Sequence, residues 1–231
     1  MYKALVTGGT QGIGLAIAKH LQQHGYEVIT CARNSNATLK CDVTDRLQVH
    51  QMREMTGPVD ILINNAGGAV SAPFLKLTEP DWDQQFQWNL KSVFYCTQEY
   101  LPAMLEKKWG RIINIASTAG KKGYAYVTAY SAAKHAVIGL TRALAQETAI
   151  HGVTVNAVCP SFVDTPMLQK SVEPISRKTG KSVEEIMETF RAHNPQKRFI
   201  TPEEVASAVL FLIETPAVNG QAISLCGGET V

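Results

Sequence analysis

Two residues that can exchange protons lie one helical turn apart in the second half of the chain. Tyr130 and Lys134, in YSAAK, share one face of a helical pattern. A phenol beside an ammonium group is a candidate general acid and base. Seven tyrosines and fourteen lysines in 231 residues produce roughly 0.4 such pairs by chance. The pair therefore predicts a catalytic site only in the company of other polar residues.

Two further polar residues strengthen this interpretation. Ser117 ends an apolar, strand-like run at 111–116, and Asn89 lies within a long, largely apolar helical pattern. Each residue also has a purely structural interpretation. Ser117 could be a turn residue, Asn89 a hydrogen-bonded core amide, and Lys134 a surface cation.

A glycine-rich turn follows the first apolar run of the chain and precedes an amphipathic helical pattern. Its sequence is TGGTQGIG at residues 7–14. Glycine lets a backbone approach a pyrophosphate closely, and the N-terminus of the following helix supplies N–H groups and a positive dipole. We predict a dinucleotide site made by Gly8, Thr10, Gln11, Gly12, Ile13 and Gly14.

The end of the second strand pattern favours a phosphorylated ribose. No carboxylate lies between Glu27 and Asp42, although a carboxylate is what usually holds a free ribose 2′-hydroxyl. Arg33 lies there instead, and a guanidinium matches a 2′-phosphate in charge and geometry. A solvated loop arginine is the alternative interpretation. We predict NADP(H) as the preferred cofactor, with NAD(H) as the alternative.

Short β-branched apolar runs alternate with helical patterns along the chain. Strands are expected at 4–7, 27–31, 38–41, 59–64, 111–116, 154–159 and 222–225, and helices at 13–24, 46–55, 81–105, 125–150 and 203–213. Strands that are apolar throughout indicate a parallel sheet covered on both faces. We predict a single-domain, doubly wound α/β (Rossmann) fold over residues 1–231, with seven parallel strands and ligands at their carboxyl ends.

Residues 164–199 interrupt this alternation. Pro166, Pro174 and Pro195 surround a short helical pattern at 183–193. Long irregular insertions in compact domains are usually lids or binding loops, so we predict a substrate lid rather than a plain surface excursion. Its apolar residues could line a pocket or pack on the body of the protein: Met167, Leu168, Ile186, Met187 and Phe190.

The composition narrows the range of partners. Lys and Arg are scattered and the net charge is +2, which argues against nucleic acid. No apolar run reaches the roughly 18 residues of a membrane span. The five cysteines are never closer than ten residues and lack metal-ligand spacing, so we expect neither disulfides nor a metal. The N-terminus has no signal or transit pattern, which predicts a cytoplasmic protein.

Together these motifs resemble the short-chain dehydrogenase/reductase family over essentially the whole chain. TGGTQGIG resembles that family's cofactor turn, CDVTD its adenine-contacting segment and NNAG its sheet-edge motif. The resemblance implies four catalytic residues: Asn89, Ser117, Tyr130 and Lys134. Beyond the glycine turn it implies cofactor contacts from Arg33, Asp42, Val43, Asn65, Ala66, Gly67, Tyr130, Lys134, Pro160, Val163 and Thr165.

Three stretches are similar to bacterial ketoreductases that act on β-ketoacyl and polyketide thioesters. ARNSNATLKCDVTD is short enough to leave little or no helix between the second and third strands. VTVNAVCPSFVDTPM and QAISLCGG add to the similarity. The family usually has a proline followed by a glycine after the sixth strand, whereas this chain has Pro160 followed by Ser161. The Cβ of Ser161 could change the loop beside the expected nicotinamide site.

The resemblance and the chemistry together imply a mechanism. Tyr130 would be the acid and base, and the ammonium of Lys134 and an oxidised nicotinamide would lower its pKa from about 10. Ser117 would orient the substrate oxygen. Lys134 would also hold ribose hydroxyls, Asn89 would anchor a water, and Thr165 would bind the nicotinamide carboxamide.

We therefore predict an NADP(H)-dependent oxidoreductase that interconverts a ketone and a secondary alcohol. A β-ketoacyl thioester is the first choice of substrate, and a small cyclic or aryl ketone or alcohol is the second. Thioester phosphates could meet Lys108, Lys121 and Lys122, although solvated surface lysines are the better interpretation. A non-catalytic dinucleotide sensor and an isomerase or epimerase are alternatives of other classes. The resemblance implies a homotetramer.

Overall fold

A parallel β-sheet forms the centre of the molecule. The computed structural model describes residues 1–34 and 36–230, apart from the side chain of Lys178. Seven strands pair in the order β3-β2-β1-β4-β5-β6-β7, and every pair is parallel. The strands are β1 (Lys3–Thr7), β2 (Glu27–Ala32), β3 (Leu39–Lys40), β4 (Ile61–Asn64), β5 (Gly110–Ile115), β6 (Val153–Pro160) and β7 (Ala222–Leu225). The predicted doubly wound α/β fold is confirmed.

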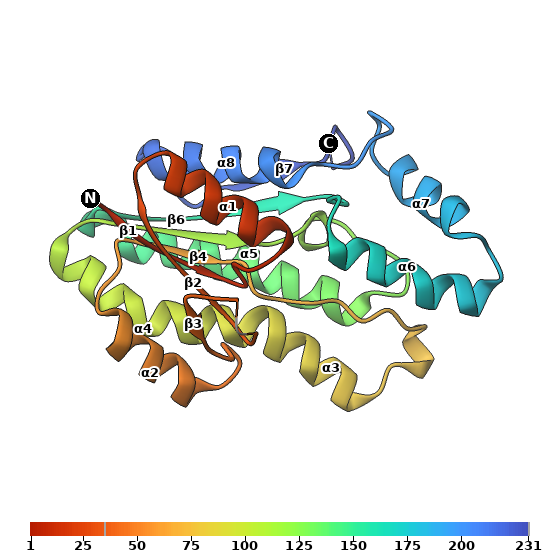
Figure 1. Cartoon of the computed structure of the whole chain (residues 1–231), viewed down its shortest axis with the longest axis horizontal. Helices are drawn as coiled ribbons and strands as arrows, with labels where there is room; N and C mark the ends of the chain where they lie inside the picture. The colour runs from red at the N-terminus through yellow and green to blue at the C-terminus, as the bar shows by residue number, and fades with distance from the viewer. Residues whose placement is uncertain (35, 231) are drawn as a thin grey trace.

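Helices cover both faces of this sheet (Figure 1). One face carries α1 (Gly12–Gln23) and α8 (Pro202–Glu214), and the other carries α2 (Arg46–Thr56), α4 (Ser92–Lys107) and α5 (Thr128–Thr148). In β1, Ala4 and Val6 belong to the core under α1 and α8, whereas Leu5 belongs to the core under α2 and α4. Successive side chains of a strand point to opposite faces, so a strand covered on both faces is apolar throughout.

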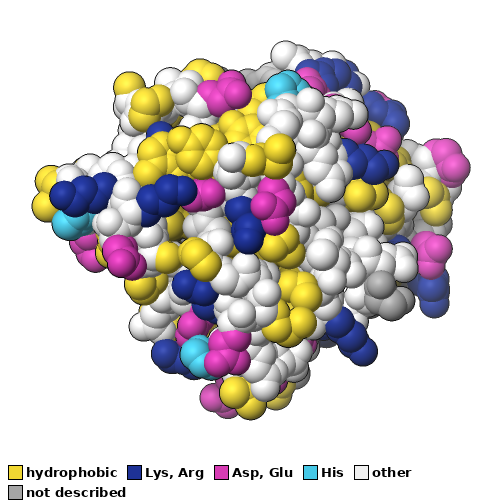
Figure 2. All heavy atoms as spheres, turned by 60° about the vertical axis from the view of Figure 1, so that its left-hand side comes forward, with side chains coloured by type: hydrophobic (Ala, Val, Ile, Leu, Met, Phe, Trp, Pro, Cys, Tyr) yellow, Lys and Arg dark blue, Asp and Glu magenta, His cyan; other side chains and the backbone are white. Residues whose placement is uncertain are grey.

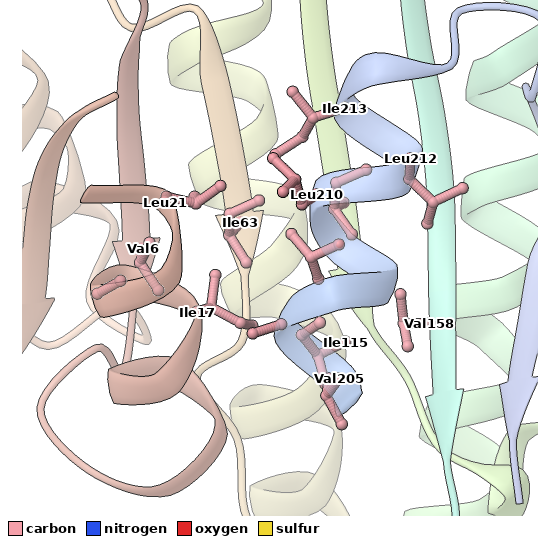
Figure 3. Close-up of a cluster of buried hydrophobic side chains, with 14 of the residues drawn as sticks. Val6, Ile17, Leu21, Ile63, Ile115, Val158, Val205, Leu210, Leu212 and Ile213 are labelled. Carbon is pink, nitrogen blue, oxygen red and sulfur yellow. The ribbon is translucent and has the colours of Figure 1, made fainter. Parts of the chain in front are cut away.

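The core under α1 and α8 consists of closely packed aliphatic side chains (Figure 3). Ile17 and Leu21 of α1 and Val205 of α8 meet strand residues such as Ile63, and all four are fully buried. Truncating such a side chain to alanine typically costs about 2–5 kcal/mol. This packing fixes α1 against the sheet and thereby fixes the turn that precedes it.

The strand order creates a crevice between two neighbouring strands. From β1 the chain goes to β2 and β3 on one side and then returns to β4 on the other. Outside the carboxyl ends of β1 and β4, the crossovers diverge and leave space for a ligand. Because β1 precedes the glycine turn and β4 precedes Asn65, both predicted motifs lie at this crevice. The described residues between β2 and β3 form no helix, as expected.

The helix expected over 81–105 is present and runs without a break from residue 79 to 107, but it contains a π-helical segment. The structure has α3 (Glu79–Phe86), a five-residue π-turn η2 (Gln87–Lys91), and then α4. α3 begins with a capping box formed by Thr78 and Asp81, which adds hydrogen bonds at its N-terminus. Periodicity shows which residues face the core but cannot reveal the extra residue of a π-turn, so the helix was predicted and the π-helical segment within it was not.

The segment 164–199 holds two helices rather than one helix and irregular chain. α7 (Val183–Ala192) matches the predicted pattern, but α6 (Pro166–Thr179) was not predicted. Pro174 lies inside α6, and an interior proline removes a helical hydrogen bond and usually breaks the pattern. Thr165 caps α6, with Pro166 at its first position, where proline is well tolerated. The remaining short helices are η1 (Phe74–Lys76), η3 (Thr118–Gly120) and η4 (Ala149–His151).

Charged side chains are distributed over the surface. On the face shown in Figure 2, Lys and Arg are interspersed with Asp and Glu. All five cysteines are buried free thiols. No helix in the described part of the chain has both the length and the hydropathy required to cross a membrane.

Candidate active site

Hydrogen bonds join the two loops at the carboxyl edge of β1 and β4. Thr7 Oγ1 accepts the backbone N–H groups of Asn65 and Ala66, both at 2.9 Å. In return, Asn65 Nδ2 donates to the carbonyl oxygens of Thr7 at 2.9 Å and Gly8 at 3.2 Å. The side-chain amide of Asn65 thus stabilises the glycine turn through both hydrogen bonds. Thr7, which the sequence did not single out, is the residue that links the two loops.

The N-terminus of α1 has the properties of a phosphate site. Gly12 has φ +50°, and a Cβ at Gly14 would lie 2.3 Å from the carbonyl oxygen of Gly8, so both positions require glycine. Gln11 makes no capping bond with its side chain, and the first turn has no acidic residue. Of the other α-helices described, α2, α3, α6, α7 and α8 have side-chain caps, whereas α4 and α5 have none. An uncapped, glycine-lined helix N-terminus fits a dinucleotide pyrophosphate.

The predicted adenosine side of the crevice lies beside this turn. Asn34 Nδ2 donates to Thr10 Oγ1 at 3.1 Å, which ties the end of β2 to the glycine turn. Arg33 is therefore adjacent to the turn, and it is exposed. Val43 is buried, and Asp42 Oδ1 accepts both the backbone N–H and the hydroxyl of Thr44. The Asp42 carboxylate therefore shapes its own turn, while the guanidinium of Arg33 is open to solvent.

Tyr130 and Lys134 lie on α5, which packs against the end of β5. Lys134 Nζ donates to the carbonyl oxygen of Ile115 at 2.8 Å and lies 5.7 Å from the centroid of the Tyr130 ring. Ser117 follows β5, and its Oγ accepts the N–H of Ala119 at 3.1 Å. Ser117 is also close enough to Tyr130 to lower the pKa of its phenol as a hydrogen-bond partner. The structure thus brings together three of the four predicted catalytic residues.

Burial controls the ionisation of Tyr130 and Lys134. It raises the pKa of Tyr130, and the hydrogen bond from Ser117 offsets only part of that rise. Burial also lowers the pKa of Lys134 to about 8. Burial thus outweighs the lowering of the Tyr130 pKa that we expect from the positive charge of Lys134. A low-dielectric environment disfavours both the phenolate and the ammonium.

Asn89, the fourth predicted residue, lies in the π-turn η2. Its Nδ2 donates to the carbonyl oxygens of Gly68 at 2.8 Å and Gln85 at 2.9 Å, and its Oδ1 accepts the N–H of Gly68 at 3.3 Å. A Cβ at Gly67 would lie 2.6 Å from Asn89 Oδ1 and 3.8 Å from Lys134 Nζ. Asn89 therefore holds the loop that follows β4 next to Lys134.

The loop after β6 approaches the glycine turn from the other side. Pro160 ends β6 opposite Leu225, and Val163 forms a bridge to Ile200. Thr165 Oγ1 accepts the N–H of Leu168 and lies 3.3 Å from the carbonyl oxygen of Val163, so its hydroxyl caps α6. A Cβ at Gly12 would lie 3.2 Å from the methyl group of Thr165, which places this threonine at the predicted cofactor crevice.

One buried carboxylate near the site was not anticipated. Glu229 lies near the end of the chain and accepts hydrogen bonds from Tyr124 and from Ser161. The presence of Ser161 after Pro160 was the only sequence signal for this contact. Among the described residues, no three His, Cys, Asp or Glu side chains are grouped as metal ligands.

The fold and the site define a dinucleotide-dependent oxidoreductase with a Ser–Tyr–Lys arrangement at the sheet edge. A family model described as short chain dehydrogenase matches residues 2–176. The chain belongs to the short chain dehydrogenase family, and the resemblance seen in the sequence is confirmed.

Known relatives cover nearly the whole chain. It is 42% identical to a "Putative ketoacyl reductase" of Streptomyces coelicolor, over 97% of this chain and 95% of that protein. It is 36% identical to an "Acetoacetyl-CoA reductase" of Rhizobium meliloti, over 98% of this chain and 97% of that protein. A crystal structure of a point variant of actinorhodin polyketide ketoreductase with NADPH superposes with a TM-score of 0.93. That match has 40% identity and covers 99% of this chain and 97% of the other.

Proposed function

We propose that this protein is an NADP(H)-dependent reductase of β-ketoacyl thioesters. The observation that carries the proposal is the meeting of Ser117, Tyr130 and Lys134 beside an uncapped, glycine-lined helix N-terminus. The relatives named as ketoacyl and acetoacetyl-CoA reductases support the substrate class.

The cofactor preference is supported by charge. Arg33 is exposed next to the glycine turn, where a guanidinium can pair with a 2′-phosphate. The related ketoreductase crystallised with NADPH supports the same choice. We assign the pyrophosphate to the N–H groups at the start of α1, and the ribose hydroxyls of the nicotinamide side to Lys134.

The chemistry of reduction divides between cofactor and protein. NADPH, when bound, supplies the hydride for the carbonyl carbon. Ser117 donates a hydrogen bond that holds the carbonyl oxygen and stabilises the charge that develops on it. The neutral phenol of Tyr130 donates the proton to that oxygen, and burial keeps it protonated beforehand. Lys134 then favours the transient phenolate through its positive charge.

We further propose that residues 164–199 are a substrate lid on a single domain. Leu168 and Ile186 are buried, and Phe190 stacks on Phe162 with 4.5 Å between ring centroids. The apolar side of α7 thus packs on the loop after β6, close to the site. Met167 of α6 is exposed and available to an acyl chain.

The proposed assembly is a homotetramer in the cytoplasm. Large apolar side chains are exposed on α4 and α8 and after α5, at Phe94, Phe211 and Ile150, and such side chains are typical of subunit interfaces. Free buried cysteines are typical of a reducing compartment. Size-exclusion chromatography with light scattering tests the assembly, and a monomer would contradict it.

A substrate panel tests the reaction. NADPH consumption is followed by absorbance with acetoacetyl-CoA and with simple cyclic and aryl ketones, and each assay is repeated with NADH. The proposal predicts the highest kcat/KM for acetoacetyl-CoA with NADPH. Faster reduction of a cyclic or aryl ketone would assign the other substrate class. NADPH binding without turnover on any member of the panel would indicate a sensor.

A further inference from the structure

A buried carboxylate near the end of the chain contacts three other segments. The side chain of Glu229 is only 2% exposed. Its Oε1 accepts the phenol O–H of Tyr124 at 2.6 Å and lies 3.0 Å from Lys122 Nζ. Ser161 Oγ donates to Oε2, and His193 Nδ1 lies 3.7 Å from Oε1. We call this group of five residues the Glu229 cluster.

These partners come from segments that surround the proposed site. Lys122 and Tyr124 lie between η3 and α5, Ser161 follows β6, and His193 follows α7. The Tyr124 hydroxyl is also hydrogen-bonded to Thr118 Oγ1 at 2.7 Å. Because Thr118 directly follows Ser117, a chain of hydrogen bonds connects Glu229 to the segment that carries the proposed catalytic serine.

Packing around the cluster reinforces these bonds. A Cβ at Gly227 would lie 1.9 Å from Asn194 Oδ1, so the C-terminal segment is in close contact with the chain that follows α7. Figure 1 shows the segment that follows β7 beside that chain. The rings of Tyr124 and His193 meet edge to face with 5.7 Å between centroids. The cluster therefore lies at the junction of the C-terminal segment, α7 and the loops of the site.

The pKa shifts of Glu229 and Tyr124 favour the hydrogen bond between them. Burial alone would raise the pKa of Glu229, but hydrogen bonds from Ser161, Tyr124 and Lys122 hold it below its ordinary value. Burial and the bond to Glu229 raise the pKa of Tyr124. Glu229 is thus an ionised acceptor, and Tyr124 is a neutral donor to it. Hydrogen bonds to a charged group are stronger than those between neutral groups.

We infer that Glu229 is a positioning residue for the proposed ketone reduction, whose carboxylate holds the 117–124 segment, the loop after β6 and the end of α7 in one arrangement. This inference rests on the proposed function. It also gives a reason for Ser161 in place of the glycine usual in this family, since glycine has no hydroxyl to donate to Glu229. Glu229 acts on substrate only through these neighbours.

The variant Glu229→Gln tests this inference, because it keeps the size of the side chain but removes the charge and one acceptor oxygen. We expect kcat for acetoacetyl-CoA to fall about tenfold or more. The dissociation constant for NADPH, measured by fluorescence, should change less than about threefold, because the hydrogen bonds and ion pairs of the Glu229 side chain involve no residue of the glycine turn. Glu54→Gln is the matched control, since Glu54 pairs with His50 on the surface of α2. It should behave like the parent.

A double-mutant cycle separates positioning from a loss of stability. Tyr124→Phe removes one hydroxyl and keeps the ring. If Glu229 acts through Tyr124, the double variant should have a kcat within about twofold of Glu229→Gln alone. If Glu229→Gln fails to fold, Ser161→Ala provides a milder change, because it removes only one of the hydrogen bonds to Glu229. We expect Ser161→Ala to lower kcat about threefold. A Glu229→Gln or Ser161→Ala kcat equal to that of the parent, or fully multiplicative effects in the cycle, would overturn the inference.

Hydrogen exchange separates this inference from the proposed function. In Glu229→Gln, amide exchange in residues 118–126 and 187–194 should become faster, while Glu54→Gln leaves both segments unchanged. If the parent does not reduce acetoacetyl-CoA, the proposed substrate is wrong, and exchange alone decides the role of the cluster. Unchanged exchange in both segments would overturn that role even if the parent is active.

Discussion

Replacing Asn89 by alanine should destabilise the fold as well as the site. The buried amide of Asn89 makes three hydrogen bonds to groups of Gly68 and Gln85. Each bond contributes about 1 kcal/mol net, and a buried group left without a partner costs about 1–3 kcal/mol. We expect Asn89→Ala to lower the free energy of unfolding by about 3–5 kcal/mol, a large part of the 5–15 kcal/mol typical of a folded domain.

Gln85 provides a matched control one turn before Asn89. Its side chain is fully buried, and neither amide atom has a hydrogen-bond partner among the described residues. Gln85→Met keeps the approximate size and removes an unpaired polar group. The free energy of unfolding should therefore stay unchanged or rise by about 1–2 kcal/mol. The backbone carbonyl that Asn89 contacts is retained.

Equilibrium unfolding in urea, followed by tryptophan fluorescence and circular dichroism, measures both changes. The NADPH dissociation constant, measured on the folded variants, reports whether the loop after β4 has moved. If Asn89→Ala lies within about 1 kcal/mol of the parent, the three hydrogen bonds are not what holds this loop. A loss in Gln85→Met as large as that in Asn89→Ala would equally refute the reasoning.

Three further predictions concern the site itself. Tyr130→Phe should lower kcat by about 10²–10⁴-fold and leave the NADPH dissociation constant within a few fold; substantial turnover would contradict its role as the acid. Arg33→Ala should lower kcat/KM with NADPH about tenfold or more and leave NADH unaffected, whereas equal losses would argue against a 2′-phosphate contact. Burial lowers the pKa of Lys134 from 10.5 to about 8, so between these values the unfolded chain binds more protons and stability rises with pH. From pH 7 to pH 9 the parent should therefore gain about 1 kcal/mol relative to Lys134→Met in urea unfolding, and parallel pH profiles would contradict the pKa of about 8.

Local patterns were sufficient to predict most of the fold. Apolar runs on β1 and β4 belong to strands covered on both faces, and periodicity placed α1 and α8 within one or two residues. α6 was missed because Pro174 disrupts the local signal, while Thr165 and the tertiary setting still support a helix. The π-turn was missed because periodicity does not reveal one extra residue in a helix, and the partner of its Asn89, Gly68, lies 21 residues earlier in the chain.

In the site, too, some features follow from local sequence and others from the tertiary structure. By itself, the sequence determined the glycine turn, Ser117 at a strand end and the pairing of Tyr130 with Lys134, because each depends on spacing within one element or at its boundary. The tertiary structure decided the ionisation of Tyr130 and Lys134, because burial is a property of the packed chain. It also decided the Glu229 cluster, whose Tyr124 and Ser161 bonds span 105 and 68 residues. Neither residue has a local reason to pair with a carboxylate near the chain end, so only the folded arrangement of strands and helices brings them together.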